Sequence, residues 1–378
     1  MDSDLVLVIV VATALAFDFT NGFHDTANVV ATAISTRAIP PRTAVAGAAL
    51  LNFAGAFISL EVAATVANGI VQADLITPTI VFAGLIGAIA WNLITWWYAL
   101  PSSSSHALIG GVVGAALVAE GTDAVIGAGL VGKVMIPALI APVLAFAIAG
   151  AAIVCAYSII GRLRPGSVNR GFRLGQVVSG GMLALSHGTN DAQKTMGIIT
   201  LALIANGNIP ENDFHVPTWV VVSAATAISL GTYAGGWRII RTLGTRIIKM
   251  DPAQGFAAQS AGATVILASS HFGYPLSTTH TISGAVMGAG AAKRLSAVRW
   301  GVAGNIVMAW VLTIPAAGAI GGLTYGLTRI FGTGALGPIV VSVLVVGLIA
   351  AIFGRRAQED ARRAALPVPR PEVGESPS

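Results

Sequence analysis

Charged residues are scarce in this sequence of 378 residues. Only 10% of them are Asp, Glu, Lys or Arg, whereas 55% are hydrophobic. A soluble domain carries about 25% charged residues, so the composition excludes an ordinary water-soluble protein and predicts a surface that faces lipid. The basic residues lie in loops and the tail rather than in one patch. No nucleic-acid partner is therefore expected, despite a net charge of +5.

Cysteine is nearly absent as well, because Cys155 is the single one. An internal disulfide framework is therefore excluded. No basic region precedes the first apolar run, which starts at Leu5 and continues into a polar motif. A cleavable signal peptide is not expected from that pattern.

Long apolar runs are abundant. About 18 to 20 apolar residues cross the hydrocarbon core of a bilayer. We therefore predict an all-α integral membrane protein with about ten to twelve membrane segments, multi-pass in the cell inner (plasma) membrane. Several runs exceed one straight span and are expected to tilt, break or divide at Gly and Pro. The candidate segments are residues 5–36, 43–71, 80–100, 102–119, 124–158, 172–205, 216–237, 255–273, 276–292, 300–328 and 335–354.

Two polar motifs each occur twice. Residues 21–28 (NGFHDTAN) are echoed by residues 187–194 (HGTNDAQK), and residues 101–115 (PSSSSHALIGGVVGA) by residues 275–289 (PLSTTHTISGAVMGA). The nearly equal offsets indicate two copies of one plan. Polar groups are costly inside apolar sequence, so these motifs are the candidate functional sites.

Loop charges predict how the copies face the membrane. The positive-inside rule places the Arg- and Lys-bearing loops in the cytoplasm, which puts the N-terminus outside and the central linker and C-terminus inside. The two copies are then inverted relative to each other. The short segments that meet at Pro101 and Pro275 read as re-entrant hairpins of two half-helices. Inverted repeats with interrupted helices are typical of secondary transporters, whose substrate lies near the midplane.

The same reading divides the chain into five parts. Residues 1–160 form a first transport repeat, 161–173 a cytoplasmic basic linker, 174–330 a second, inverted repeat, 331–354 a final transmembrane helix and 355–378 a disordered cytoplasmic tail.

The Ser/Thr motifs favour anion binding. Each precedes an apolar helix, and free amides at a helix start together with the helix dipole attract anions. Two such loops could hold a tetrahedral oxyanion from both sides. Ordinary N-capping and small-residue packing is the structural alternative. The predicted phosphate-binding residues are Ser103, Ser104, Ser105, Ser277, Thr278 and Thr279.

The Asp motifs favour a cation or proton. Carboxylate and amide oxygens are hard ligands for a small cation, and a carboxylate also accepts a proton. Gly22 and Gly188 would let the helices unwind there, whereas a purely structural buried carboxylate is the alternative. Lys194 could neutralise the second carboxylate or contact the anion. The predicted coupling residues are Asp25, Asp191, Asn21, Asn28, Asn190 and His24.

Four of the six histidines lie in the duplicated motifs: His24, His106, His187 and His280. A zinc site would need several to converge. Proton handling or hydrogen bonding to the motif backbone fits their pattern equally well, so no resident metal site and no cofactor are predicted.

The four motifs in order resemble the inorganic phosphate transporter (PiT) family, over nearly the whole chain. Its Gly-x-Asn-Asp-type motif matches Gly22–Asp25 and Gly188–Asp191, and its Pro-x-Ser-x-x-His motif matches Pro101–His106 and Pro275–His280. The resemblance implies that the Ser/Thr loops bind phosphate and that the Asp motifs bind the driving cation.

Departures from the family pattern suggest the driving ion. His24 replaces the usual Asn, and Asn52 and a residue near Gln259 stand where some sodium-coupled members carry glutamate. The chain thus resembles the low-affinity bacterial members, which run on protons and take phosphate free or as a neutral metal complex. His106, His280, His187, Lys194, Asn52 and Gln259 are assigned supporting roles.

The resulting hypothesis is a secondary active transporter that imports inorganic phosphate with protons by alternating access. A sodium-coupled phosphate or sulfate symporter and a channel are alternatives. An intramembrane hydrolase is a remote one, since nucleophilic chemistry needs one asymmetric constellation and both halves carry the same set. The protein is therefore not expected to be an enzyme. Its partners are phosphate and the lipid bilayer, with a homodimer as one option for its assembly.

Overall fold

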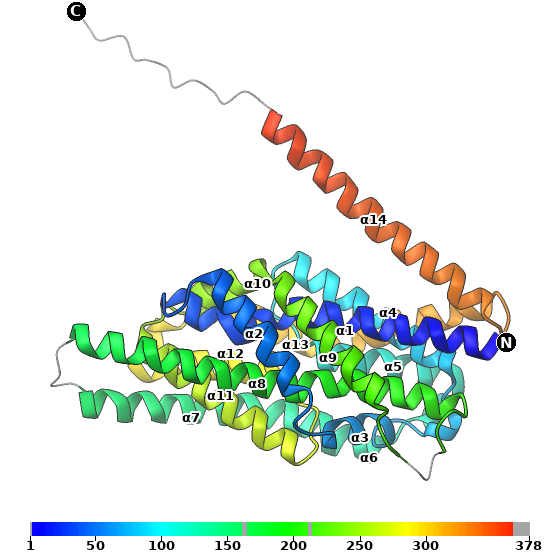
Figure 1. Cartoon of the computed structure of the whole chain (residues 1–378), viewed down its shortest axis with the longest axis horizontal. Coiled ribbons are helices and arrows are strands. Elements are labelled where there is room, and N and C mark those ends of the chain that lie inside the picture. The colour runs from blue at the N-terminus through cyan, green and yellow to red at the C-terminus, as the bar shows by residue number, and fades with distance from the viewer. Residues whose placement is uncertain (1, 161–164, 211–213, 366–378) are drawn as a thin grey trace, which may run out of the picture.

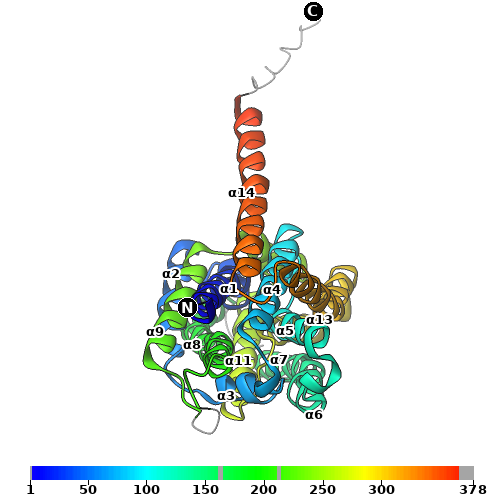
Figure 2. The ribbon, with the colours of Figure 1, turned by 90° about the vertical axis from the view of Figure 1, so that its right-hand side faces the viewer.

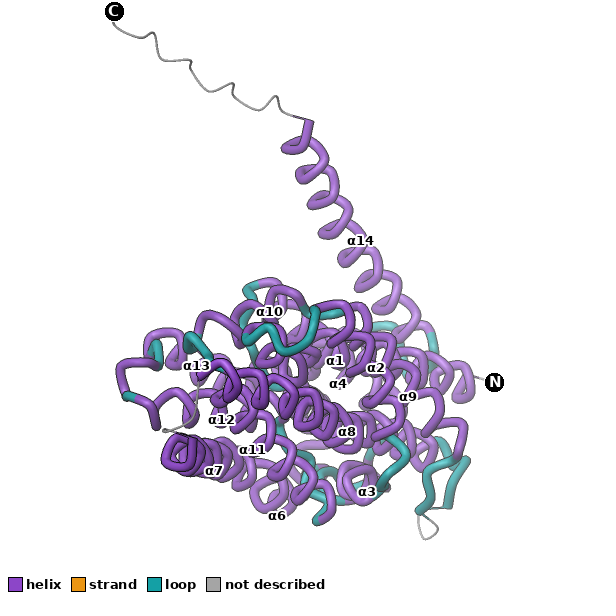
Figure 3. Tube along the Cα trace, turned by 60° about the vertical axis from the view of Figure 1, so that its left-hand side comes forward, coloured by secondary structure: helices purple, strands orange, loops and turns teal. Residues whose placement is uncertain are grey.

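The computed structural model describes residues 2–160, 165–210 and 214–365. Within these ranges the chain consists of helices and loops, apart from one isolated bridge between Val71 and Val125 (Figure 3). The predicted all-α fold is confirmed.

The first half of the chain contains seven α-helices joined by short turns. They are α1 (Asp2–Ser35), α2 (Pro41–Gly55), α3 (Glu61–Asn68), α4 (Pro78–Trp97), α5 (Ser104–Glu120), α6 (Gly127–Gly129) and α7 (Ile136–Ile160), with a π-helical stretch at Leu130–Met135. The second half contains seven more. They are α8 (Pro165–Ala205), α9 (Thr218–Ala234), α10 (Trp237–Arg241), α11 (Pro252–His271), α12 (Thr278–Lys293), α13 (Trp300–Arg329) and α14 (Leu336–Ala365).

A helical hairpin is present at each predicted turn, while its re-entry into the membrane stays a prediction; α4 and α5 are each long enough to cross the membrane. Helices α4 and α5 pack together around Pro101, and α11 and α12 pack together around Pro275. Each hairpin also packs on a long helix from the other half of the chain, α5 on α13 and α12 on α7. The helices that carry the Asp motifs also pack on the opposite half of the chain: α1 packs on α9, and α8 packs on α2 and α3. The two halves are therefore interlocked rather than separate.

Two apolar cores flank the polar motifs. Along α1 the first core takes residues between Val6 and Phe17, and the second core takes residues between Ala27 and Ala31. Along α8 the order is reversed, with Leu183 in the second core and residues from Ala192 onward in the first. The two motif helices thus run in opposite directions between the same cores. This agrees with the inversion predicted from the loop charges, which stays a prediction.

The expectation that α1 and α8 unwind at their motif glycines is wrong. Both helices run unbroken through Gly22 and Gly188. The glycines instead allow close backbone contact, because a Cβ on Gly22 would lie 2.4 Å from the Ile228 carbonyl oxygen and one on Gly188 would lie 2.2 Å from that of Asn52. Small residues at such crossings are typical of membrane helix packing.

Five described helical stretches are long and apolar enough to cross a membrane, or six if the bent pair Thr218–Ala234 and Trp237–Arg246 counts as one span. Fewer than ten to twelve pass because others are short half-helices or carry the polar motifs. The long α8, for example, contains His187, Asp191 and Lys194. Several apolar helices nonetheless make this a multi-pass membrane protein.

Two predicted boundaries shift. Residues 165–173 of the expected linker form the first turns of α8, and the expected tail from Arg355 is helical as far as Ala365. Residues 161–164 and 366–378 of those segments lie outside the described residues. Helix α14 begins beside α13 and projects away from the bundle (Figures 1 and 2).

Candidate functional site

The Ser-rich and Thr-rich loops begin the second helix of each hairpin. Ser103 caps α5 by accepting a hydrogen bond from the His106 amide at 3.1 Å, and Ser277 caps α12 by accepting one from the His280 amide at 3.2 Å. These two hydroxyls therefore do what the capping alternative predicted. The tips also touch each other, since the Ser105 hydroxyl donates to the Leu276 carbonyl at 3.2 Å.

Both aspartates of the duplicated motif reach the tip of α12. The Thr278 hydroxyl lies 3.4 Å from Asp25 Oδ2 and 3.2 Å from Asp191 Oδ2, and the Thr279 hydroxyl lies 3.2 Å from Asp25 Oδ1. The Asn28 amide donates to both threonines, at 3.3 and 2.9 Å. Two motifs far apart in sequence thus form one buried cluster around a single helix start.

Lys194 joins this cluster to the tip of α5. Its buried ammonium group donates to Asp191, to the Ser105 hydroxyl and, at 2.7 Å, to the Leu276 carbonyl. The two roles considered for Lys194 are therefore compatible, because one side chain neutralises Asp191 and reaches the loop expected to bind an anion.

Each aspartate also has a histidine. His24 Nδ1 lies 3.0 Å from Asp25 Oδ1, and His187 Nε2 lies 3.0 Å from Asp191 Oδ2. Ligand atoms of Asp25, His187 and Asp191 lie within 4.8 Å of one another. Two carboxylates and an imidazole could hold a cation, although Lys194 already occupies one oxygen of Asp191.

The remaining predicted residues surround this cluster. The Asn52 amide donates to Thr232 at 2.8 Å, and its oxygen lies 3.3 Å from His187 Nδ1. The Asn190 amide donates to Ser270 at 2.8 Å. The oxygen of Gln259 accepts from Ser179 at 2.8 Å, in the packing of α11 against α8. Asn52 therefore supports the site through His187, whereas Gln259 joins two helices away from the carboxylates.

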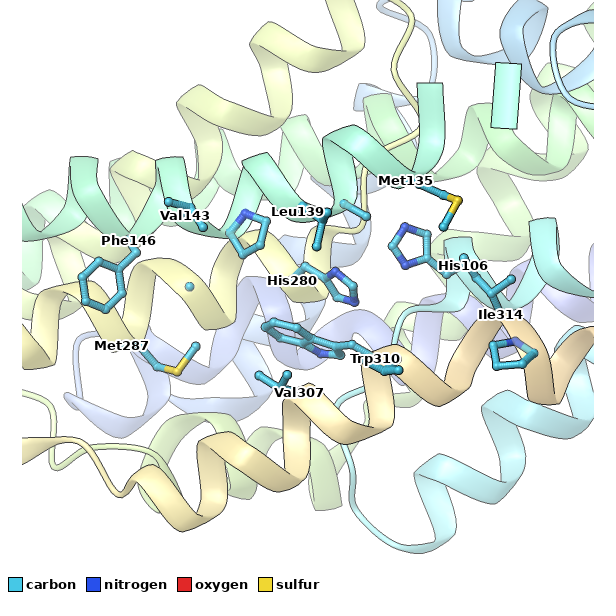
Figure 4. A pocket seen from close by; sticks show the side chains of 15 residues that line it. His106, Met135, Leu139, Val143, Phe146, His280, Met287, Val307, Trp310 and Ile314 are labelled. Atoms are coloured by element: carbon cyan, nitrogen blue, oxygen red, sulfur yellow. The ribbon is translucent and has the colours of Figure 1, made fainter. Parts of the chain in front are cut away.

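His106 and His280 face elsewhere. Their rings meet edge to face at 4.7 Å, and the His280 ring stacks on Trp310 at 4.1 Å. Both line a cavity of about 680 Å³ whose other walls are apolar side chains of α7, α12 and α13 (Figure 4). Two of the four motif histidines, His24 and His187, therefore contact the carboxylates, and the other two, His106 and His280, line this cavity.

Sequence reasoning missed one acidic residue. Asp18 lies on α1, fully buried, two helical turns before Asp25. An acidic residue inside the apolar run from Leu5 was the available signal. The duplication gives no hint of it, because the matching place in the second copy is Ala184.

Comparison with known proteins places this geometry in a family. The family model described as "Phosphate transporter family" matches residues 21–167 and 162–321. The chain is 53% identical over 327 residues, 86% of its length and 78% of the relative's, to a protein of Mycobacterium bovis named "Probable low-affinity inorganic phosphate transporter". A protein of the same name from Rhizobium meliloti is 48% identical over 329 residues, 86% of this chain and 98% of that one.

A solved structure agrees with the sequence relatives. "The sodium-dependent phosphate transporter" superposes with a TM-score of 0.78 at 25% identity, over 86% of this chain and 99% of that chain. The duplicated motifs, their convergence on the hairpin tips and these matches have one explanation. The chain belongs to the phosphate transporter family.

Proposed function

We propose that this protein imports inorganic phosphate, free or as a neutral metal complex, together with protons by alternating access. Relatives about half identical to it are named low-affinity inorganic phosphate transporters. The observation that supports the proposal best is the convergence of Asp25 and Asp191, one from each half, on the tip of α12. A carrier that rocks its halves around one substrate needs residues of both halves at that point.

Phosphate would bind between the two hairpin tips. Lys194 supplies a positive charge there, and the amide-rich starts of α5 and α12 supply donors. The Ser104 hydroxyl is buried without a hydrogen-bond partner, so it is free to accept or donate. Thr278 and Thr279 would exchange a carboxylate partner for the anion. The candidate phosphate ligands therefore remain those at positions 103–105 and 277–279, with Ser103 and Ser277 acting mainly as caps.

The coupling step would follow from charge balance. When Lys194 turns toward phosphate, the buried Asp191 carboxylate loses its lysine and keeps only the contacts with His187 and Thr278, which is costly. A proton or another cation arriving at Asp191 or Asp25 would remove that cost. Anion and cation would then load together, and the neutralised site could cross the membrane.

Uptake by proteoliposomes tests the coupling. We expect an inward proton gradient to drive phosphate accumulation in sodium-free buffer, with loss of driven uptake in Asp25→Asn and Asp191→Asn. Asp123→Asn, which alters an exposed loop carboxylate, is the control and should behave as wild type. Accumulation that needs sodium and ignores the proton gradient would contradict proton coupling.

Sodium coupling is the second candidate, favoured by the fold shared with a sodium-dependent phosphate transporter. The sodium arm of the same assay decides between them, and competition by sulfate tests the choice of anion. The hydrolase alternative gains no support from Ser102, Ser103 and Ser105. Their described partners are Thr95, the His106 amide, Lys194 and the Leu276 carbonyl, with no histidine ring among them.

The predicted orientation belongs to the same proposal. The inversion of the two repeats is supported by the opposite directions of α1 and α8 between the two cores. An N-terminus outside and a C-terminus inside rest on the loop charges alone. A plasma-membrane location follows from the same role.

A further inference from the structure

Asp18 is a buried carboxyl group that forms no ion pair among the described residues. Its relative exposure is 0%, and neither oxygen makes a hydrogen bond. Burying an ionised carboxylate without compensation costs several kcal/mol, so buried carboxylates are normally paired, protonated or bound to a metal ion. Nothing in the packing of an apolar helix requires an acid at this position.

Two neutral polar side chains lie within hydrogen-bonding reach of this carboxyl. Asn21, one turn along α1, and Thr195, on α8, lie beside it. The Asn21 side-chain oxygen and the Thr195 hydroxyl are buried and make no hydrogen bond. Four buried oxygens, two from Asp18 and one from each neighbour, therefore gather here, and the donors within reach of the carboxyl are the neutral side chains of Thr195 and Asn21.

The charged groups that act on Asp18 do not fill this gap. Asp191 and Lys194, both on α8, are the charges that affect it. Lys194 is already bonded to Asp191, Ser105 and the Leu276 carbonyl. On α1 itself, Asp25 lies two turns away and is paired with His24.

Helices α4 and α9, which pack most extensively on α1 besides α8, offer no counter-ion either. Helix α4 contains no acidic, basic or histidine residue, and the ionisable residue of α9 is the exposed Tyr233. Within the described part of the chain, Asp18 thus has no ion-pair partner.

We propose that Asp18, Asn21 and Thr195 form a second monovalent-cation site, which takes a proton or a sodium ion. Carboxylate, amide and hydroxyl oxygens are the hard ligands that such cations prefer. A proton would satisfy one carboxyl oxygen, and a sodium ion among the four could satisfy all of them. This inference rests on the proposed phosphate transport and adds a coupling ion to it.

The site breaks the internal symmetry. At the matching positions of the other copy, Ala184 stands for Asp18 and Val29 for Thr195. Only one of the two places related by the internal repeat can therefore hold this ion. The cation would bind beside the shared cluster, close enough to interact with the charges of Asp191 and Lys194. Its presence would therefore change the free energy of the step in which those side chains exchange partners.

Two transport assays on the same proteoliposomes test the proposal. Phosphate exchange at equal concentrations on both sides needs the phosphate site, whereas accumulation also needs the coupling ions. For Asp18→Asn we expect the ratio of accumulation to exchange to fall by about tenfold or more, a loss of at least 1.4 kcal/mol of coupling. A wild-type ratio in that variant would overturn the proposal. Failure of exchange in the wild type would instead refute phosphate transport itself.

Thr195→Val provides the second variant, because it removes one ligand oxygen at nearly constant volume and copies Val29 of the other half. We expect a weaker apparent affinity for the driving cation, by about threefold or more, with little change in the phosphate KM. Unchanged cation dependence would count against the site. Asp123→Asn is the matched control, with an exposed carboxylate and wild-type behaviour expected.

The arms of the assay identify the ion. If the Asp18→Asn defect is confined to uptake driven by a proton gradient, the ion is a proton. A defect confined to sodium-driven uptake, together with loss of a sodium-induced rise in Tm that the wild type shows, identifies sodium. If accumulation and exchange fall by the same factor in Asp18→Asn, and likewise in Thr195→Val, the role of these residues is merely structural and the proposal is overturned.

Discussion

At the scale of single residues, the site is asymmetric although its motifs are duplicated. Asn28 and Lys194 occupy matching positions, yet Asn28 donates to Thr278 and Thr279 while Lys194 reaches the other hairpin through Ser105. One half thus contributes a neutral amide and the other a charge. The phosphate site and the coupling site are joined by that charge.

Lys194→Gln should lower stability, because it leaves Asp191 buried without its cation; breaking a buried pair costs about 3–5 kcal/mol. The double variant Lys194→Gln with Asp191→Asn should recover most of the lost Tm but no driven uptake. Thermal unfolding in detergent measures the first effect and proteoliposome uptake the second. Equal Tm values for the single and the double variant would show that the pair is not coupled.

Thr279→Val removes one hydroxyl from Asp25 and from the expected anion ligands while keeping its volume. We expect the phosphate KM to rise by about tenfold, the size of one hydrogen bond to a charged group. Thr264→Val, which removes an exposed hydroxyl of α11 that bonds only the Ser260 carbonyl, serves as the control. An unchanged KM for Thr279→Val would remove this residue from the phosphate site.

At the scale of elements, the motif glycines set how closely the helices cross. Gly22 meets α9, and Gly188 meets α2 at Asn52. Closeness at Gly188 also brings Asn52 within reach of His187. A glycine that first suggested a break in the helix therefore acts in the opposite way, by letting an unbroken helix touch its neighbour.

Gly188→Ala should destabilise the protein by about 1–3 kcal/mol, since its Cβ would meet backbone that cannot move aside easily. Gly47→Ala, on α2, is the matched control, because a Cβ there meets nothing within 4 Å. That control should be neutral or slightly stabilising, as Ala favours helix over Gly. Similar Tm losses in the two variants would contradict the packing role.

Local features of these elements could be predicted from the sequence, whereas contacts between distant elements could not. The hairpins at Pro101 and Pro275 and the caps at Ser103 and Ser277 follow from local chemistry, so they could be predicted. The meeting of Thr279 with Asp25 depends on how α12 packs against α1, which no local pattern encodes. Asp18 could not be predicted from the repeated motifs, because it is present in one copy only.

At the scale of the whole molecule, the interlocked halves make a single unit around one cluster. Each hairpin leans on a long helix of the other half, so a movement of one half must carry part of the other. Alternating access in such a fold would change the contact between the tips, where Ser105 meets Leu276.

The inverted orientation makes its own prediction. In a Cys155→Ser background, Asp123→Cys should react with a membrane-impermeant maleimide in intact cells, and Arg170→Cys should react only after the membrane is opened. The positive-inside rule places the loop that contains Asp123 outside and the start of α8 inside. The reverse labelling pattern would mean that the protein has the opposite orientation in the membrane. Labelling of both cysteines from outside would contradict the inverted arrangement of the two repeats.

The most direct measurement of the central claim is a structure of the protein in lipid with phosphate. The account predicts tetrahedral density between residues 103–105 and 277–279, within hydrogen-bonding reach of Lys194, and its loss in Lys194→Gln. Phosphate held by one hairpin alone, or bound away from both tips, would contradict it.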